Sequence, residues 1–488
     1  EQRTLLLGRL LRELLYPHLA KELKEVLRRE AQQVLVAECA RRLRTMAVDA
    51  MPARVQDGAD VVKPEHERGG KKKKKERPAE EAWRPSALLP NATTTQGEPV
   101  AKEGGAEWHP RAARVVGMCV NVEDREAELA AVDEAGELVD TFKCRWLMTN
   151  IRARRDGGGP SALDVERKMG ELDRLALFLQ ETRCEAIAVG TCDLLCRRFK
   201  DELETLAFGM GLMACYPERG REYAQAYYRV SSRMDDMPLP EHPNIARAEV
   251  QQHVPFKVHF TDESVPRLWS VTTAAATEHA EASEAVRTAL SSARLLQEPL
   301  VEMAHCVGPT GLSLLKLPLH PLMASLPEEQ LERALEAEMV HGVCRLGVDF
   351  GRALAHDHYG KLLQFVPGLG PRKAAKLLRE VLAQSAAKSA PANRDELRGF
   401  LGPCVHFNAA GFIKFLPPEA PGGLQHAPGL EGCRVHPEAY RFAKKMCFDA
   451  MQEDEDEEAQ ETEDALDEAV FAAMSDKGTC TMSQLDLE

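Results

Sequence analysis

The sequence predicts a multidomain protein of mixed α and α/β class. Its 488 residues suffice for about three domains at roughly 150 residues each. Helical periodicity dominates the amino end, and short apolar segments of strand length alternate with helical patterns after residue 113. Hydrophobic residues make up 44% of the chain, but no window holds the ~18 consecutive apolar residues that a membrane span needs. We therefore expect no membrane partner.

The net charge of −14 has a local origin. The stretch from Glu453 to Glu468 carries eleven acids and no base, and without these eleven acids the net charge is −3. The acidity therefore does not exclude a nucleic-acid partner for the rest of the chain. The 13 cysteines are scattered singly, without a C-x-x-C pair, which excludes a disulfide framework and a zinc-binding pair and favours a reducing compartment.

Residues 1–51 are predicted to be a helical core segment. Apolar residues recur there at three- and four-residue steps from Leu10 to Leu27, and a second run from Val34 to Met46 continues the pattern. We expect this apolar side to pack on later parts of the chain or on preceding material, because such helices do not stand alone. The first residues lack an initiator Met and a cleavable signal pattern, so we expect a piece of a longer protein.

Residues 52–112 are predicted to be a disordered basic linker. The helical periodicity of apolar residues stops in this segment, which contains several prolines. It also contains the run from Gly69 to Lys75, two glycines followed by five lysines. The lysine run has two interpretations. One is a functional signal, for nuclear import or nucleic-acid contact, and the other is a solvated loop insert without such a role.

Residues 113–298 are predicted to form a mixed sheet covered by helices. An apolar strand from Arg114 to Val120 precedes a hairpin, and helices then alternate with further strands. The expected elements after the first strand are a hairpin at 128–132 and 137–142, a helix at 161–182, a strand at 186–189, a helix at 193–208, a strand at 257–260 and a helix at 286–296. This order matches the ribonuclease H-like fold.

Such a fold cuts nucleic acid only if carboxylates from different strands hold two divalent metals. The first strand offers the thiol of Cys119 in place of an acid. Glu263, after a later strand, is one candidate ligand, but one carboxylate cannot hold two metals. We therefore predict a scaffold with no catalytic residue, metal ligand or cofactor. The alternative is a structure-selective metal-dependent nuclease, in which Glu263 acts with Glu281 or Glu284.

Residues 361–416 are predicted to form a tandem helix-hairpin-helix, after a helical connector at 299–360. In the first copy, Gly368 and Gly370 permit left-handed backbone angles around the apolar Leu369, and Pro371 is tolerated in the first helical turn. The exposed amides at Gly368 and Gly370 and at the helix start would face a phosphate. The flanking cations that would assist them are Arg372, Lys373 and Lys376.

The segment 395–412 repeats this plan, with Gly402 in the turn and Lys414 just beyond it. From Lys361 to Phe415 there are nine bases and three acids. The two copies are expected to pack together and to bind nucleic-acid backbone, without reading base sequence. The alternative is a helical pair used only for packing or protein contacts. The nearby histidines are expected to be satisfied or solvent-facing rather than metal ligands, namely His356, His358, His406 and His436.

Several segments together resemble one protein family. The residues that carry the likeness are Leu15–Leu23, Asp262–Trp269, Ala293–Leu300, Leu317–Leu322, Gln364–Ala374 and Arg434–Tyr440. The chain resembles the suppressor-of-Ty-six family of eukaryotic transcription elongation factors and histone chaperones and, more distantly, the bacterial regulator Tex.

The resemblance implies a helical core, a YqgF-type ribonuclease H-like domain without nuclease activity, a tandem helix-hairpin-helix and a small helical death-like domain. The last would start near Gly432, within residues 417–488, with the acidic tail interpreted as a solvated helix and loop or as an attractor of basic histone surfaces. The resemblance also implies a non-enzymatic elongation factor and histone chaperone, acting in the nucleus on chromatin. Its partners would be DNA or RNA backbone, histones and the RNA polymerase II elongation complex.

Overall fold

The computed structural model describes residues 2–49, 113–149, 161–216, 220–230, 250, 253–305, 307, 314–385, 391–416, 429–451 and 463–474. The predicted linker, including its lysine run, lies outside the described residues, and so do residues 453–462 of the acidic stretch. None of the described helices is long and apolar enough to cross a membrane.

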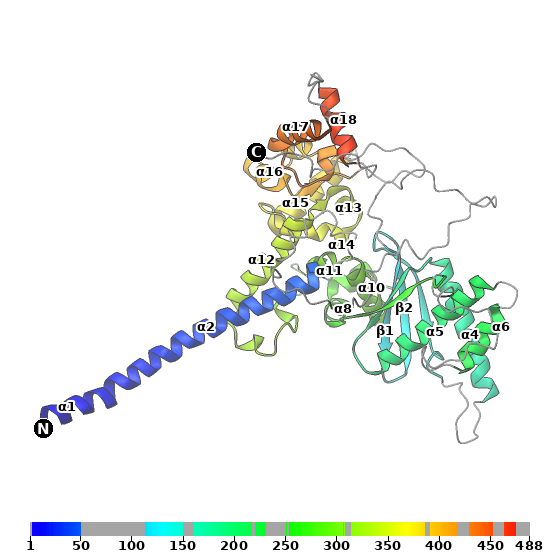
Figure 1. The fold of residues 1–488 in the computed structure, drawn as a ribbon, viewed down its shortest axis with the longest axis horizontal. Helices are drawn as coiled ribbons and strands as arrows, with labels where there is room; N and C mark the ends of the chain where they lie inside the picture. The colour runs from blue at the N-terminus through cyan, green and yellow to red at the C-terminus, as the bar shows by residue number, and fades with distance from the viewer. Residues whose placement is uncertain are drawn as a thin grey trace, which may run out of the picture.

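The amino end is one continuous helical rod, as the leucine spacing predicts. It consists of α1 (Gln2–Leu10), the π-helical turn η1 (Leu11–Leu15), α2 (Tyr16–Arg44) and the π-helical turn η2 (Thr45–Asp49). Pro17, which has no amide hydrogen, directly follows the π-helical turn η1, where the Tyr16 amide donates to the Leu11 carbonyl oxygen five residues earlier. Figure 1 shows the rod projecting away from the rest of the molecule.

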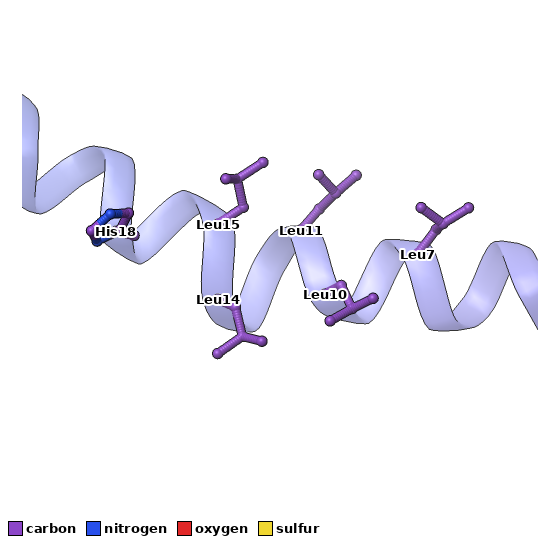
Figure 2. Close-up of a pocket in the computed structure, with 6 residues that line it drawn as sticks. All are labelled: Leu7, Leu10, Leu11, Leu14, Leu15 and His18. Atoms are coloured by element: carbon purple, nitrogen blue, oxygen red, sulfur yellow. The ribbon is translucent and has the colours of Figure 1, made fainter.

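Only the carboxyl end of this rod packs on later parts of the chain. Cys39 and Leu43 are fully buried, and Arg44 forms an ion pair with Glu338 of α12 (Glu328–Leu346) at 2.7 Å. The leucines nearer the amino end do not pack on later parts of the described chain, since Leu14 is 65% exposed. Their packing on preceding material, the other expectation, stays a prediction. Figure 2 shows the exposed row from Leu7 to His18 along this part of the rod.

The central sheet has the predicted strands in a mixed arrangement. The strand order is β3-β2-β1-β4-β5, with β1 antiparallel to β2, β2 antiparallel to β3, and β1, β4 and β5 parallel. The strands are β1 (Val115–Asn121), β2 (Glu126–Val132), β3 (Leu138–Cys144), β4 (Ala186–Gly190) and β5 (Lys257–Thr261).

Helices cover both faces of this sheet. The side chains of β1 alternate between two cores: Val116 and Met118 face α4 (Ala162–Glu181) and α5 (Leu195–Cys215), whereas Cys119 faces α10 (Glu284–Gln297). Gly117 lets α10 cross close to β1, because a Cβ there would lie 1.8 Å from the Ala289 carbonyl oxygen. Figure 1 shows α4 and α5 on one side of the strands and α10 on the other.

The remaining elements connect the sheet to the carboxyl end, and most of them are short. They are α6 (Gly220–Val230), α8 (Ser264–Ser270), α9 (Thr273–Glu278), α11 (Pro299–His305), η5 (Leu314–Lys316), η6 (Met323–Ser325), α13 (Phe350–Ala355), α14 (Asp357–Gly360), η9 (Gly429–Gly432), η10 (Pro437–Ala439), α17 (Tyr440–Met451) and α18 (Glu463–Met474). The helices α17 and α18 pack around a small separate core that includes Phe448 and Val470.

A two-residue parallel pairing encloses the predicted hairpins. The strand β6 (Val348–Asp349) precedes them and β7 (Ile413–Lys414) follows them, with Val348 opposite Ile413. The Val348 amide donates to the Phe412 carbonyl oxygen at 2.8 Å, and both Val348 and Ile413 are fully buried. The segment between these strands is therefore anchored at both ends to one point of the core.

Candidate nucleic-acid interface

The first hairpin has the predicted backbone geometry. The 3-10 helix η7 (Lys361–Phe365) leads into the turn, and α15 (Gly370–Ser385) leaves it. Gly368 has φ +88° and Gly370 has φ +65°, which are angles that side-chain-bearing residues rarely adopt. Leu369 between them is buried in the main core, which holds the turn in place. The prediction of two left-handed glycines around an apolar plug is therefore confirmed.

The turn faces outward and is rich in donors. Gly368 is exposed, and the first-turn amides of α15 have no carbonyl one turn back to accept them. Arg372, Lys373 and Lys376 are all exposed on α15. Lys373 Nζ donates to the Gly368 carbonyl oxygen at 2.9 Å, which covers this acceptor of the turn. The Leu369 amide donates to the Val366 carbonyl oxygen within the turn, so the donors that face outward are those at the start of α15. The arrangement is an anion-binding corner formed by amide hydrogens and cations.

The three cations differ in how strongly they are held. Lys376 lies 3.5 Å from Glu380 one turn later, a solvent-exposed pair that stabilises little. Arg372 makes no hydrogen bond or ion pair with any residue that the structure describes. Its guanidinium is therefore the most available of the three for an external anion.

The second hairpin does not repeat the backbone plan of the first, so the prediction of two equivalent turns is wrong. It comprises η8 (Asp395–Gly399) and α16 (Pro403–Ala410). Gly402 precedes α16 with φ −64° and ψ 156°, which is ordinary extended backbone, and Gly399 is not left-handed either. The first turn of α16 contains Pro403 and Cys404 and no cation.

The two hairpins touch each other through the first glycine. A Cβ on Gly368 would lie 3.2 Å from Asn408 Cβ and 3.5 Å from the Val405 carbonyl oxygen, both on α16. Around Gly402, in contrast, an added Cβ would meet nothing within 4 Å. The structure thus brings Gly368, Gly370, Arg372, Lys373 and Lys376 together on one turn, with α16 packed beside it.

Arg394 is not part of the exposed charge that the sequence suggests. It is fully buried and donates to carbonyl oxygens that include those of Ile413 at 2.7 Å and Val435 at 2.6 Å. It also donates to Tyr440 Oη at 2.7 Å and lies 3.8 Å from the Glu431 carboxylate. The nine-base count therefore overstates the positive surface, because this cation instead joins the second hairpin to the carboxyl-terminal segment.

Lys414 lies on β7 and is half-buried. Its aliphatic chain packs against Gly347, where an added Cβ would lie 2.6 Å from Lys414 Cε. Burial, together with the nearby positive charge of Arg434, lowers the pKa of Lys414. It is therefore less accessible to an external partner than the cations of α15.

A carboxylate and an arginine pair just after the end of β5. Glu263 is 4% exposed, and its Oε2 lies 2.6 Å from Arg267 Nε. Gly190 makes room for this carboxylate, since a Cβ there would lie 1.5 Å from Glu263 Oε1. Burial and the charge of Glu263 raise the pKa of Cys119 to about 12, which keeps this thiol protonated.

No group of three potential metal ligands occurs in the part of the chain that the structure describes. The other acids of the nuclease hypothesis are exposed: Glu284 is the first residue of α10, and Glu281 lies in the turn before it. The buried Glu263 is instead neutralised by a cation of the same chain. This geometry does not favour the nuclease alternative.

The four histidines near the hairpins are all satisfied, as predicted. His356 Nδ1 lies 2.8 Å from Glu137 Oε1, and His358 Nε2 lies 3.1 Å from the Ala135 carbonyl oxygen. His406 contacts the Arg394 carbonyl oxygen at 2.8 Å, and His436 contacts that of Phe407 at 3.0 Å. These contacts tie the hairpins to the sheet and to the carboxyl-terminal segment.

Sequence reasoning missed a buried charge cluster between the sheet and the hairpins. His305 Nε2 lies 3.1 Å from Glu278 Oε2, and Glu278 Oε1 accepts from Arg294 Nη1 at 3.0 Å. Glu302, fully buried, lies 3.7 Å from His305 Nδ1. Burial alone would lower the pKa of His305, but the two carboxylates outweigh it and raise this pKa to about 9. No sequence spacing signals the cluster, because its members come from three helices.

Known proteins match the chain over the hairpins and beyond. A family model described as a helix-hairpin-helix motif matches residues 312–416, a range that begins earlier than the predicted hairpin boundary at 361. The chain is 29% identical over 360 residues to a transcription elongation factor SPT6 homolog of Arabidopsis thaliana, covering 74% of this chain and 19% of that protein.

Two animal relatives agree with this match. The chain is 30% identical over 360 residues to the Suppressor of Ty 6 homolog of Caenorhabditis elegans, covering 72% of this chain and 20% of that protein. It is 32% identical over 210 residues to the transcription elongation factor SPT6 of Drosophila melanogaster, covering 42% of this chain and 11% of that protein. The chain thus spans at most about a fifth of the length of these relatives. With the hairpin geometry, these matches show that the chain belongs to the suppressor-of-Ty-six family.

Proposed function

We propose that this chain is a non-enzymatic part of a transcription elongation factor that grips nucleic-acid backbone through its helix-hairpin-helix unit. The observation that carries the proposal is the first turn, where Gly368 and Gly370 adopt left-handed angles beside the exposed Arg372. The family model over residues 312–416 supports the same reading. Backbone amides and cations recognise phosphate without distinguishing bases, so binding would be independent of sequence.

The contributions of the predicted site residues would be unequal. A phosphate would accept hydrogen bonds from the free amides of the turn, with Arg372, Lys373 and Lys376 supplying charge. Gly402 would add a weaker contact, because it is exposed but lies in an extended conformation without a cation in the first turn of α16. Lys414 would add the least, because it is half-buried and burial opposes its charged form.

The sheet would serve as an inactive scaffold of the ribonuclease H-like, YqgF type. Its strand order, with an antiparallel hairpin followed by two parallel strands, supports this assignment. The thiol of Cys119 and the Glu263–Arg267 ion pair support the absence of nuclease activity, because they stand where acids would hold metal.

The wider role would be exercised in the nucleus, on chromatin. Two of the relatives are transcription elongation factors, which supports contacts with an RNA polymerase II elongation complex, and the family resemblance supports histone contacts. The helices α17 and α18, with their own small core, would correspond to the start of the family's death-like domain.

Reversing the charge of the hairpin tests the proposal. The triple variant Arg372→Glu, Lys373→Glu and Lys376→Glu should weaken binding to every nucleic-acid sequence alike. The plot of log affinity against log salt has a negative slope. The magnitude of this slope should decrease by about one unit for each lost phosphate contact, and so by about three units. Fluorescence anisotropy of labelled DNA and RNA at several salt concentrations measures both quantities.

A matched control changes the same net charge elsewhere. Lys21, Lys24 and Arg28 are exposed on α2, outside the hairpin family match, so their triple reversal to Glu should leave the salt slope within one unit of the wild type. Equal effects of the two triple variants would show that only net charge matters. Unchanged binding by the hairpin variant would leave the hairpins a packing or protein-contact role.

A further inference from the structure

The second hairpin presents a polar side chain to the first. Two residues of α16, Val405 and Asn408, face Gly368, since a Cβ on this glycine would lie 3.5 Å from the Val405 carbonyl oxygen and 3.2 Å from Asn408 Cβ. Residues three apart in a helix share one side of it. This side of α16 is therefore the one that is turned toward the first hairpin.

The two residues on this side differ in exposure. Val405 is half-buried and packs against the main core, whereas Asn408 is exposed. The Asn408 side chain makes no hydrogen bond with any residue that the structure describes. Its carboxamide carries two N–H donors and one acceptor oxygen, and these groups are therefore available to an external molecule next to the turn.

The same glycine is also in contact with a cation. Lys373 Nζ donates to the Gly368 carbonyl oxygen at 2.9 Å, so Gly368 has the exposed Lys373 and the exposed Asn408 as neighbours. The amides at the start of α15 begin two residues further along the chain, at Gly370. Amide hydrogens, a cation and a neutral side-chain donor therefore occur at one turn, and the neutral donor belongs to the second hairpin.

We infer that Asn408 is a further nucleic-acid-binding residue, whose carboxamide donates to a backbone oxygen of the strand that is held at the first hairpin. The inference rests on the proposed backbone-binding function and extends it, because the second hairpin then adds a side chain to a shared site. Asparagine is among the side chains that donate to phosphate and sugar oxygens in protein–DNA complexes. It carries no charge, so the salt dependence of binding distinguishes its contribution from that of the cations.

The first test removes the carboxamide in the full 488-residue chain. Asn408→Ala keeps the Cβ that lies against Gly368. Its affinity for fluorescein-labelled DNA and RNA should be about fivefold lower than that of the wild type, because one hydrogen bond is lost. The slope of log affinity against log salt should not change, because no cation is removed.

A second variant replaces the donor by a negative charge of the same shape. Asn408→Asp should weaken binding more than Asn408→Ala, because its carboxylate repels phosphate and attracts the ammonium of Lys373. The magnitude of the salt slope should decrease by about one unit, since one cation is then neutralised. Gln33→Glu, at an exposed position of α2, introduces the same charge outside the hairpin family match and should bind as the wild type does.

A matched control removes a carboxamide elsewhere on the hairpin unit. Gln384 is exposed near the carboxyl end of α15, about 20 Å along the helix axis from Gly370, so Gln384→Ala should bind as the wild type does. Thermal unfolding of each variant reports on the fold. Asn408→Ala that binds as tightly as Gln384→Ala would contradict the inference. So would a loss of affinity that is accompanied by a lower Tm, since Asn408 would then be structural.

The proposed function can fail separately from this inference. If the triple reversal of Arg372, Lys373 and Lys376 leaves binding unchanged, the backbone-binding function and the role of Asn408 are both wrong. If the triple variant binds more weakly and Asn408→Ala does not, only the role of Asn408 is wrong. The second hairpin would then contribute to the site by packing alone.

Discussion

The two hairpins have similar sequences and different structures. In the first, Gly368 and Gly370 are left-handed, the turn is exposed and cations follow it. In the second, Gly402 is extended, the helix α16 begins without a cation, and of the two arginines before the turn Arg398 is exposed and Arg394 is buried. The first has the features of an anion site, whereas the second supports it by packing Val405 and Asn408 against Gly368.

The difference shows that glycines in a sequence allow left-handed backbone angles but do not by themselves produce them. Glycine allows positive φ at little cost, but a turn adopts it only when the surrounding packing requires it. Leu369 imposes that requirement by occupying the core between two positive-φ glycines. In the second copy, Gly399 and Gly402 are separated by two residues, and Leu401 reaches the same core without a positive φ at either glycine.

The largest expected effect concerns the structural role of the second copy. Arg394→Met should lower the free energy of unfolding by about 3–5 kcal/mol, because it removes a buried cation, leaves several carbonyl oxygens without their donor and takes away the positive charge beside Glu431. Urea denaturation measures the change. Arg398→Met, at an exposed position four residues later, should change the same quantity by less than about 0.5 kcal/mol.

A smaller loss of stability is expected at alkaline pH, outside both hairpins. The folded-state pKa of His305 is raised to about 9 by Glu278 and Glu302, against a normal value near 6.5. The stabilisation is therefore complete below about pH 6.5 and is lost as the pH rises through about 9. Its size is roughly 3 kcal/mol.

The measurement compares wild type with His305→Gln by urea denaturation between pH 6 and 10. The difference in unfolding free energy between the two proteins should shrink as the pH rises, and a constant difference would contradict the assignment. Nucleic-acid binding by the folded wild type should be followed over the same range. A parallel loss of binding would show that the first hairpin depends on this distant cluster.

The smallest expected changes in stability come from replacing one glycine in each turn by alanine. Gly368→Ala should lower the free energy of unfolding by about 1–2 kcal/mol, because φ is +88° and the new Cβ would press on Asn408. Gly402→Ala should be neutral or stabilising by about 0.4–1 kcal/mol, because its angles suit any residue and open space surrounds it. Thermal denaturation of both variants measures the two changes in the free energy of unfolding. Equal effects would mean that the two turns are equivalent after all.

Much of the fold could be predicted from local patterns. The strands of the sheet and the helices α4, α5 and α10 follow from runs whose periodicity matches their burial, as in β1, where alternate side chains enter two different cores. The first hairpin could be predicted as well, because its glycines, its apolar plug and Pro371 are all neighbours in sequence.

The rest depends on contacts between residues far apart in the chain. Arg394 looks like an exposed cation until the carbonyl oxygens of Ile413 and Val435 are placed around it. Glu263 looks like a possible metal ligand in the sequence. In the structure its carboxylate occupies the space left by the missing side chain of Gly190 and pairs with Arg267. The leucine row on α1 and η1 shows the reverse case, since an amphipathic pattern predicts a covered face and cannot say what covers it.

The short pairing of β6 with β7 has a mechanical consequence. Because the strands are parallel, a pull on the chain before Val348 and after Lys414 acts along them in opposite directions and loads their hydrogen bonds in shear, together rather than one after another. The hairpins between them would carry none of that tension while the pair holds. When the protein is pulled from both ends, the hairpin segment between β6 and β7 would therefore keep its folded geometry.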